Sequence, residues 1–202
     1  MIDPVTSVRR DFVNGYLGEI RRCVDSLPMA DVARFLECLE RAYQDDRQVY
    51  IIGNGGSAAT ASHMACDLAK NVYPATSMGT VRRFRVSSLT DNVALITALA
   101  NDCGYDRVFS EQLTNVLQKD DLVVAISASG NSPNILDALA LARDRGARTA
   151  ALLGFDGGRA RDMVDVALVV GSHDYGHVED LHLVVNHLAA TWMRQLLLAA
   201  VS

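Results

Sequence analysis

Two short segments rich in glycine and serine have the composition of anion-binding loops. Gly53–Ser57 reads GNGGS and Ser127–Ser132 reads SASGNS, and each lies between a run of apolar residues and a segment with helical periodicity. Glycines let the backbone approach an anion closely, serine hydroxyls donate hydrogen bonds, and the first turn of a helix offers free N–H groups and a partial positive charge. The two segments therefore predict a binding site for phosphate.

Other interpretations of these segments remain open. Gly53, Gly55 and Ala58 fit the dinucleotide fingerprint G-x-G-x-x-G/A, but that fingerprint expects an acidic residue about 20 positions further on. The first strong candidate, Asp91, lies nearly twice as far along, which argues against an NAD-dependent oxidoreductase. The serines could simply cap a helix, although a cap needs one serine and this segment has three. A third turn, Gly154–Gly158 (GFDGG), is either a further ligand loop or a tight turn.

Histidines and carboxylates form a second set of candidate functional residues. His63 and Asp67 are four residues apart after the first glycine loop, so they share one face of a helix. In the last apolar segment Glu179 precedes His182 by three residues and His187 by eight, which also places them on one face. Two carboxylates and two imidazoles could bind a divalent transition ion such as zinc. The alternative is that all are partly buried polar residues of amphipathic helices.

The elements that must position these residues alternate along the chain. Residues 1–46 predict two amphipathic helices that break at Leu27–Pro28, and residues 47–202 predict an α/β core with a long C-terminal helix. Apolar strands that alternate with helices indicate a parallel sheet covered on both faces. The expected strands are Val49–Ile52, Phe84–Leu89, Asp121–Ser127, Arg148–Leu153 and Val164–Val170. The expected helices are Ala58–Asn71, Val93–Ala100, Tyr105–Leu117, Pro133–Arg145, a short one after Gly158, and one from Val178 to the end.

The composition limits the classes of partner. Half of the 202 residues are hydrophobic, 21% are charged, and the formal net charge of −5 argues against a nucleic-acid partner. The most apolar stretch, Leu181–Ala200, is interrupted by polar residues, and the N-terminus has no apolar run typical of a signal peptide. Four widely spaced cysteines without a CxxC motif are typical of reduced thiols. We expect a soluble, cytoplasmic protein with no membrane partner.

The order and spacing of these motifs resemble the sugar isomerase (SIS) domain family, and most closely its phosphoheptose isomerase group. The motifs are GNGGSA at Gly53–Ala58, His63 in SHMACDL, the segment Ala100–Phe109, SASGNS, GFDGG, and VEDLHLVVNH at Val178–His187. The resemblance implies one SIS domain over residues 1–202, with a three-layer, flavodoxin-like, five-stranded parallel sheet. It also implies a homotetramer with sites near subunit interfaces. The implied reaction converts sedoheptulose 7-phosphate into D-glycero-D-heptose 7-phosphate through an enediol.

The resemblance assigns a role to each candidate residue. Asp67 is the expected base and His187 the expected acid, with a zinc ion that polarises the carbonyl. The expected metal ligands are His63, Asp67, Glu179 and His187. The expected substrate-binding residues are Asn54, Gly55, Gly56, Ser57, Asn101, Asp102, Ser127, Ala128, Ser129, Ser132 and Glu179.

The chain departs from the family pattern at four places. Asp67 stands where the family has Glu, Glu179 where it has Gln, and Ala128 where it has Thr, and the expected basic residue appears as Lys70 or is displaced to Asn71. Because Asp67 and Glu179 both keep oxygen ligands, we expect an adjusted active site. The alternative is a non-catalytic SIS protein that binds a phosphosugar, similar to the relative that binds a replication initiator and lacks the acid and base residues.

Overall fold

The computed structural model describes residues 4–73 and 82–199. Its helices are α1 (Pro4–Asp25), α2 (Met29–Gln44), α3 (Gly56–Cys66), α4 (Val93–Cys103), α5 (Val108–Val116), α6 (Pro133–Asp144) and α7 (Tyr175–Ala199). Its strands are β1 (Gln48–Gly53), β2 (Arg85–Ser88), β3 (Leu122–Ser127), β4 (Arg148–Leu153) and β5 (Val166–Val169). A π-helical turn, Asp67–Asn71, continues α3, and 3-10 turns span Tyr105–Arg107 and Arg159–Met163.

The sheet confirms the predicted fold class. All pairings are parallel and the strand order is β2-β1-β3-β4-β5, the flavodoxin-like order. The chain leaves β1 toward one edge of the sheet and β3 toward the other. These two strands are neighbours, with Gly53 paired to Ile126, so the loops that follow them meet at one point. In such sheets that switch point is where ligands bind.

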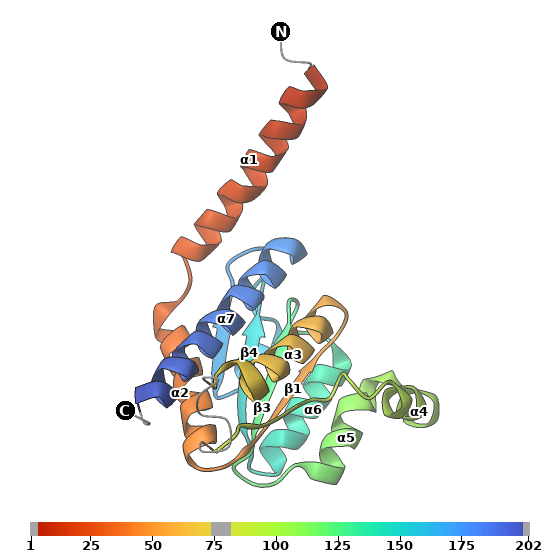
Figure 1. The fold of residues 1–202 in the computed structure, drawn as a ribbon. Coiled ribbons are helices and arrows are strands. Elements are labelled where there is room, and N and C mark those ends of the chain that lie inside the picture. Colours follow the sequence, from red (N-terminus) through yellow and green to blue (C-terminus); the bar gives the residue numbers. More distant parts are fainter. Residues whose placement is uncertain (1–3, 74–81, 200–202) are drawn as a thin grey trace.

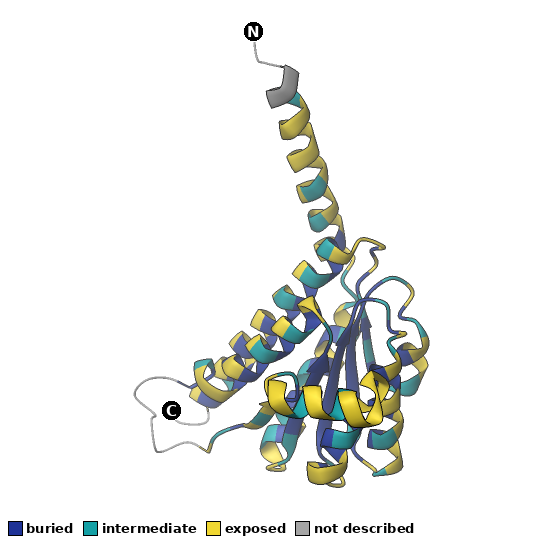
Figure 2. Ribbon diagram, turned by 90° about the vertical axis from the view of Figure 1, so that its right-hand side faces the viewer, coloured by how far each residue is buried: buried dark blue, intermediate teal, exposed yellow. Residues whose placement is uncertain are grey.

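Helices cover both faces of the sheet, as the apolar strands predict. On one face α2, α3 and α7 pack on side chains such as Ile51 and Val124, while on the other α5 and α6 pack on Ile52 and Val123. The alternation of neighbouring residues between two buried clusters follows from the two-residue period of a strand. Figure 2 shows the strands buried between exposed outer helix faces.

Several helix bounds differ from the predictions. Helix α4 runs three residues past the expected end at Ala100, and the expected helix Tyr105–Leu117 begins with a 3-10 turn before α5. The regular part of α3 stops at Cys66, because the next turn is π-helical up to Asn71. Helix α7 begins at Tyr175, three residues earlier than expected, because Asp174 Oδ1 accepts a hydrogen bond from the backbone N–H of His177 at 3.2 Å. Side-chain acceptors of this kind start helices. The expected end of α7, residues 200–202, lies outside the described residues.

Helix α1 extends away from the rest of the molecule (Figure 1). Its largest exposed apolar side chain is Phe12, which is 73% exposed. It meets α7 through Tyr16, whose hydroxyl donates a 2.6 Å hydrogen bond to Asp180 Oδ2 and whose ring lies 4.5 Å from that of His177. The bond to the carboxylate raises the pKa of Tyr16 to about 12, so the phenol remains a donor at neutral pH. Within the described ranges, no helix has the length and apolar character that a membrane crossing needs.

Candidate functional site

The first loop leads directly from β1 into α3. The backbone at Gly55 is left-handed, with φ of 54°, which glycine adopts without strain. A Cβ at Gly56 would collide with the carboxylate of Glu179, so glycine at this position leaves room for that side chain over the loop. The loop is therefore shaped by contacts with α7 as well as by its own turn.

The second loop presents serines that do not cap the helix behind it. Ser132 occupies the N-cap position of α6, yet its hydroxyl makes no capping hydrogen bond. The Ser127 hydroxyl accepts from the N–H of Gly130 at 3.2 Å, and the Ser129 hydroxyl accepts from the N–H of Asn131 at 3.3 Å. The capping interpretation therefore does not hold for Ser132.

The third turn supports the second loop. Gly157 N–H donates to the Gly154 carbonyl at 2.8 Å, which makes this segment a tight turn. Gly154 N–H donates to the Ala128 carbonyl at 2.9 Å, and Arg159 N–H donates to Asn131 Oδ1 at 3.0 Å. We conclude that the GFDGG segment braces the serine loop.

A cavity of about 130 Å³ lies between the two loops and the start of α7. This volume suits a phosphate-sized group, because pockets that enclose whole drug-sized ligands measure roughly 300–1,000 Å³. Ile126 is one of the residues that line the cavity. The cavity brings together many of the predicted substrate-binding residues, namely Asn54, Ser57, Ser127, Ala128, Ser129, Ser132 and Glu179. Tyr175, which was not predicted, also lines it.

Four predicted substrate-binding residues do not line this cavity: Gly55 and Gly56 lie in the loop between Asn54 and Ser57, and Asn101 and Asp102 lie on α4. Asn101 and Asp102 are exposed on α4, and the Asn101 amide donates to Asp102 Oδ1 at 2.7 Å. Neither is among the described residues that line the cavity. Figure 1 shows α4 well separated from α7. Tyr105, three residues beyond Asp102, does reach a cavity residue, because its hydroxyl donates to Asn54 Oδ1 at 2.9 Å.

Tyr175 is a cavity residue that sequence reasoning missed. Its ring packs edge-on against Phe155 of the third turn, with centroids 4.9 Å apart. An exposed aromatic residue that is held beside a polar cavity can contact a ligand. The only sequence signal was its place shortly before the VEDLHLVVNH motif.

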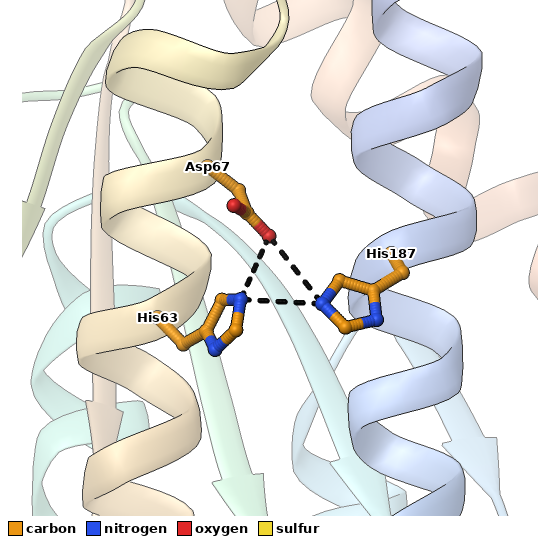
Figure 3. Close-up of side chains that lie close together, drawn as sticks. All are labelled: His63, Asp67 and His187. Atoms are coloured by element: carbon orange, nitrogen blue, oxygen red, sulfur yellow. Dashed lines mark hydrogen bonds and ion pairs between the residues drawn. The ribbon is translucent and has the colours of Figure 1, made fainter.

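The predicted metal ligands come together in part (Figure 3). His63 Nε2 lies 3.2 Å from His187 Nε2 and 3.3 Å from Asp67 Oδ2, and the remaining separation, from His187 Nε2 to Asp67 Oδ2, is 3.9 Å. Glu179 is not a member of this group of described residues; its carboxylate lies over Gly56 instead. The structure thus assembles three of the four predicted ligands.

The donor set of His63, Asp67 and His187 fits a transition metal ion. Ligands bound tetrahedrally to zinc at 2.0–2.1 Å are spaced about 3.3 Å apart, close to two of the three observed separations. Two imidazole nitrogens that face each other at 3.2 Å need either a shared proton or a cation between them. Both histidines are exposed, which leaves room for a further ligand.

Asp67 is the buried member of the group. Only 4% of its surface is exposed, and both carboxylate oxygens accept hydrogen bonds from side-chain amides. Asn71 donates to Oδ1 at 2.6 Å and Asn186 donates to Oδ2 at 3.0 Å. The role of Asn186 could not be found in the sequence, because it depends on how α7 packs against the turn after α3.

His182 does not take part in this group. Its Nε2–H donates to the carbonyl of Leu153 at 3.0 Å, at the end of β4. Burial lowers the pKa of His182 to about 4, because a charged imidazole would lose its solvation. His182 is therefore a neutral structural residue.

Comparisons with known proteins agree with the architecture and the motifs. The SIS domain family model matches residues 15–154. Phosphoheptose isomerases from Pelobacter propionicus and Geobacter sulfurreducens are 39% and 38% identical to the chain; the alignments cover 85% and 78% of the chain and 86% and 80% of those proteins.

Solved structures give the same result. A phosphoheptose isomerase structure from Neisseria gonorrhoeae superposes with a TM-score of 0.83 at 27% identity, over 92% of this chain and 98% of that one. A phosphoheptose isomerase structure from Francisella tularensis superposes with a TM-score of 0.84 at 26% identity, over 93% and 98% of the two chains. The chain therefore belongs to the SIS domain family and, within that family, to the phosphoheptose isomerase group of enzymes.

Proposed function

We propose that the protein isomerises sedoheptulose 7-phosphate to D-glycero-D-heptose 7-phosphate. The observation that carries this proposal is the distance between the cavity and the histidine–aspartate group. Along α3, His63 lies six residues beyond the cavity residue Ser57, and along α7, His187 lies eight beyond Glu179. At 1.5 Å per residue these intervals span roughly 9 and 12 Å.

A heptose 7-phosphate matches this span. Six carbon–carbon bonds of about 1.5 Å each, followed by the phosphate ester, extend over roughly 10 Å. With its phosphate in the cavity, such a sugar reaches the histidine–aspartate group with its first two carbons, between which the isomerisation takes place. An unreactive phosphate held at a distance helps to position the reacting carbons.

The chemistry requires one proton to leave C1 and one to arrive at C2. In this proposal Asp67 removes the proton from C1 while His187 donates a proton to the carbonyl oxygen on C2, which gives the enediol. Asp67 then returns its proton to C2 while His187 accepts the proton of the C1 hydroxyl, which gives the aldose. His63, Asp67 and His187 would hold a zinc ion, which when bound supplies polarisation of the carbonyl. Asp67 and His187 thus have two proposed roles, and neither can coordinate a metal ion and exchange a proton through the same atom at the same time. Turnover and metal content must therefore be measured separately.

Exposed apolar surface supports assembly into the homotetramer that the resemblance implies. The exposed apolar side chains of α1 include Val8, Phe12, Val13 and Leu17. His187 itself borders a groove of about 360 Å³ that it shares with Leu36, Leu188 and Trp192. Contact between copies at this groove would place the site beside a subunit interface.

The test combines turnover with metal analysis. NMR of sedoheptulose 7-phosphate incubated with the protein is expected to show the aldose product, and elemental analysis is expected to find zinc. Asp67→Asn should lower turnover by at least about 10²-fold and leave phosphate binding intact. Asp144→Asn, an exposed change at the end of α6, is the control. Phosphosugar binding without any turnover by the unaltered protein would favour the non-catalytic alternative.

A further inference from the structure

We propose that Asn71 and Asn186 are positioning residues that fix Asp67 for metal binding. We call this pair of side chains the amide clamp. The inference rests on the metal site of the proposed function and adds two residues to it. Neither was among the ligands or substrate-binding residues expected from the sequence.

The two amides of the clamp donate hydrogen bonds to Asp67 from two separate elements. Asn71 is the last residue of the π-helical turn, and its side-chain amide donates to Asp67 Oδ1 at 2.6 Å. The turn is defined by the hydrogen bond from Val72 N–H to the Asp67 carbonyl, five residues back, at 3.2 Å. Asn186 comes from α7, one residue before His187, and donates to Asp67 Oδ2 at 3.0 Å. Single π-helical turns within helices are frequent at functional sites.

The charge of the clamp matters as much as its geometry. A buried carboxylate must be hydrogen-bonded or paired, and in most proteins Lys or Arg supplies the pairing. Among the described residues, the side chains that hydrogen-bond or ion-pair with Asp67 are two neutral amides and two imidazoles. The amides satisfy the oxygens without adding a positive charge, so the negative charge of Asp67 remains available to a cation.

The clamp also decides which oxygen faces the histidines. With Oδ1 turned toward Asn71, Oδ2 is the oxygen that lies nearest His63 Nε2 and His187 Nε2. Asn186 donates to this same Oδ2 and is only 1% exposed, so it cannot turn away into solvent. Partners of this kind, which orient a ligand from behind, typically change metal affinity 10–100-fold when they are removed.

Asn186 would be a poor choice for packing alone. Its Oδ1 is buried and has no hydrogen-bond partner among the described residues. An unpaired buried carbonyl is unfavourable, and a leucine of similar size would avoid it. Asn186→Leu would remove this unpaired carbonyl but also one donor to the buried Asp67 carboxylate. A purely structural role therefore predicts a lower free energy of unfolding and unchanged metal binding by the folded variant. The amide clamp predicts the loss of metal affinity without a loss of fold.

The experiment measures cobalt binding to the full-length protein. Co²⁺ reports its own coordination geometry in the visible spectrum, and its affinity is obtained by competition with a chelator. Asn186→Leu and Asn71→Leu are each expected to weaken Co²⁺ binding about 10–100-fold and to alter the visible bands. Asn115→Leu, at an exposed position of α5, should change neither. Thermal unfolding without metal shows whether each variant is folded. Because Asn71 is only half-buried, Asn71→Leu tests the clamp without a change in the core.

The outcomes separate this inference from the proposed function. Folded variants that bind Co²⁺ as tightly as the unaltered protein, with the same spectrum, would overturn the amide clamp and leave the isomerase proposal standing. An unaltered protein that turns over substrate but binds neither Co²⁺ nor Zn²⁺ would overturn the clamp and the metal site together. Absence of turnover with intact, clamp-dependent metal binding would reject the isomerase proposal alone.

Discussion

Asn54 and Asn134 are joined by two reciprocal amide hydrogen bonds of 2.9 Å each, although 80 residues separate them in the chain. Asn54 belongs to the glycine loop that follows β1, and Asn134 lies in the first turn of α6, the helix that follows the serine loop. Tyr105 adds a third bond, from its hydroxyl to Asn54 Oδ1 at 2.9 Å. The pair therefore holds the two loops at a fixed separation, which a ligand bound by both requires.

Asn134→Leu should separate the two loops. Asn134 is 1% exposed, and its loss takes the acceptor away from the Asn54 side-chain NH2 while the bond from Tyr105 to Asn54 Oδ1 remains, so the free energy of unfolding should fall by about 1–3 kcal/mol. We expect KM for sedoheptulose 7-phosphate to rise about tenfold, which corresponds to one or two lost hydrogen bonds. Steady-state kinetics and urea unfolding measure the two effects, with Asn115→Leu as the control. An unchanged KM in a destabilised variant would show that the pair serves stability only.

Gly130→Ala should distort the serine loop. The backbone at Gly130 is left-handed, with φ of 61°, and a Cβ there would collide with the carbonyl oxygen of Gly157. We expect a loss of at least about 2 kcal/mol in unfolding free energy, together with weaker phosphate binding. Gly171→Ala is a matched control, because a Cβ at that position would meet no atom within 4 Å. Equal behaviour of the two variants in calorimetry would contradict the prediction.

The lowered pKa of His182 predicts that the protein loses stability in mild acid. The unfolded chain protonates this imidazole near its ordinary pKa of 6.5, whereas the folded protein does so only near 4. Between these values the unfolded state binds more protons, so the free energy of unfolding falls as the pH is lowered from about 6.5 to 4 and levels off below that. The contribution of this residue is about 3 kcal/mol at most.

His182→Gln isolates this contribution, since the amide can still donate to the Leu153 carbonyl. Urea unfolding at a series of pH values should show a shallower decline below pH 6.5 for the variant than for the unaltered protein. Parallel curves would mean that His182 is not the group responsible.

Phe12→Glu should weaken the assembly of copies. Phe12 is among the most exposed apolar side chains of α1, and a charge there would oppose its burial against another chain. We expect sedimentation velocity to show a smaller species than for the unaltered protein. Asn14→Glu, which adds the same charge to another face of the helix, should leave the assembly intact. A species of unaltered size for Phe12→Glu would show that α1 is not the contact.

The sheet and its loops were predictable from the sequence because their signals are local. All five strands lie within two residues of the predicted bounds. The inner strands β1, β3 and β4 are the nearly continuous apolar runs that buried parallel strands require, whereas the edge strand β2 is mostly exposed. The glycine and serine loops were found for a similar reason, because they follow such runs directly.

The missed features depend on contacts between distant segments. The sequence pairs His63 with Asp67 on one helix, but it does not show that Asn186 reaches the same carboxylate from α7. Glu179 and His187 share a face of α7, yet two turns of helix place one at the cavity between the two loops and the other at the histidine–aspartate group. The sequence predicts ordinary helix where the structure has the π-helical turn, because a change in hydrogen-bond register over five residues does not alter the apolar periodicity.

His187 belongs to two environments at once. Its Nε2 faces His63 and Asp67, while its ring forms part of the groove with Leu36, Leu188 and Trp192. Whatever fills the groove and whatever binds at Nε2 therefore touch the same imidazole. Thermodynamic reciprocity then requires that, if one of these partners alters the affinity of the ring for the other, the second alters the affinity for the first by the same factor.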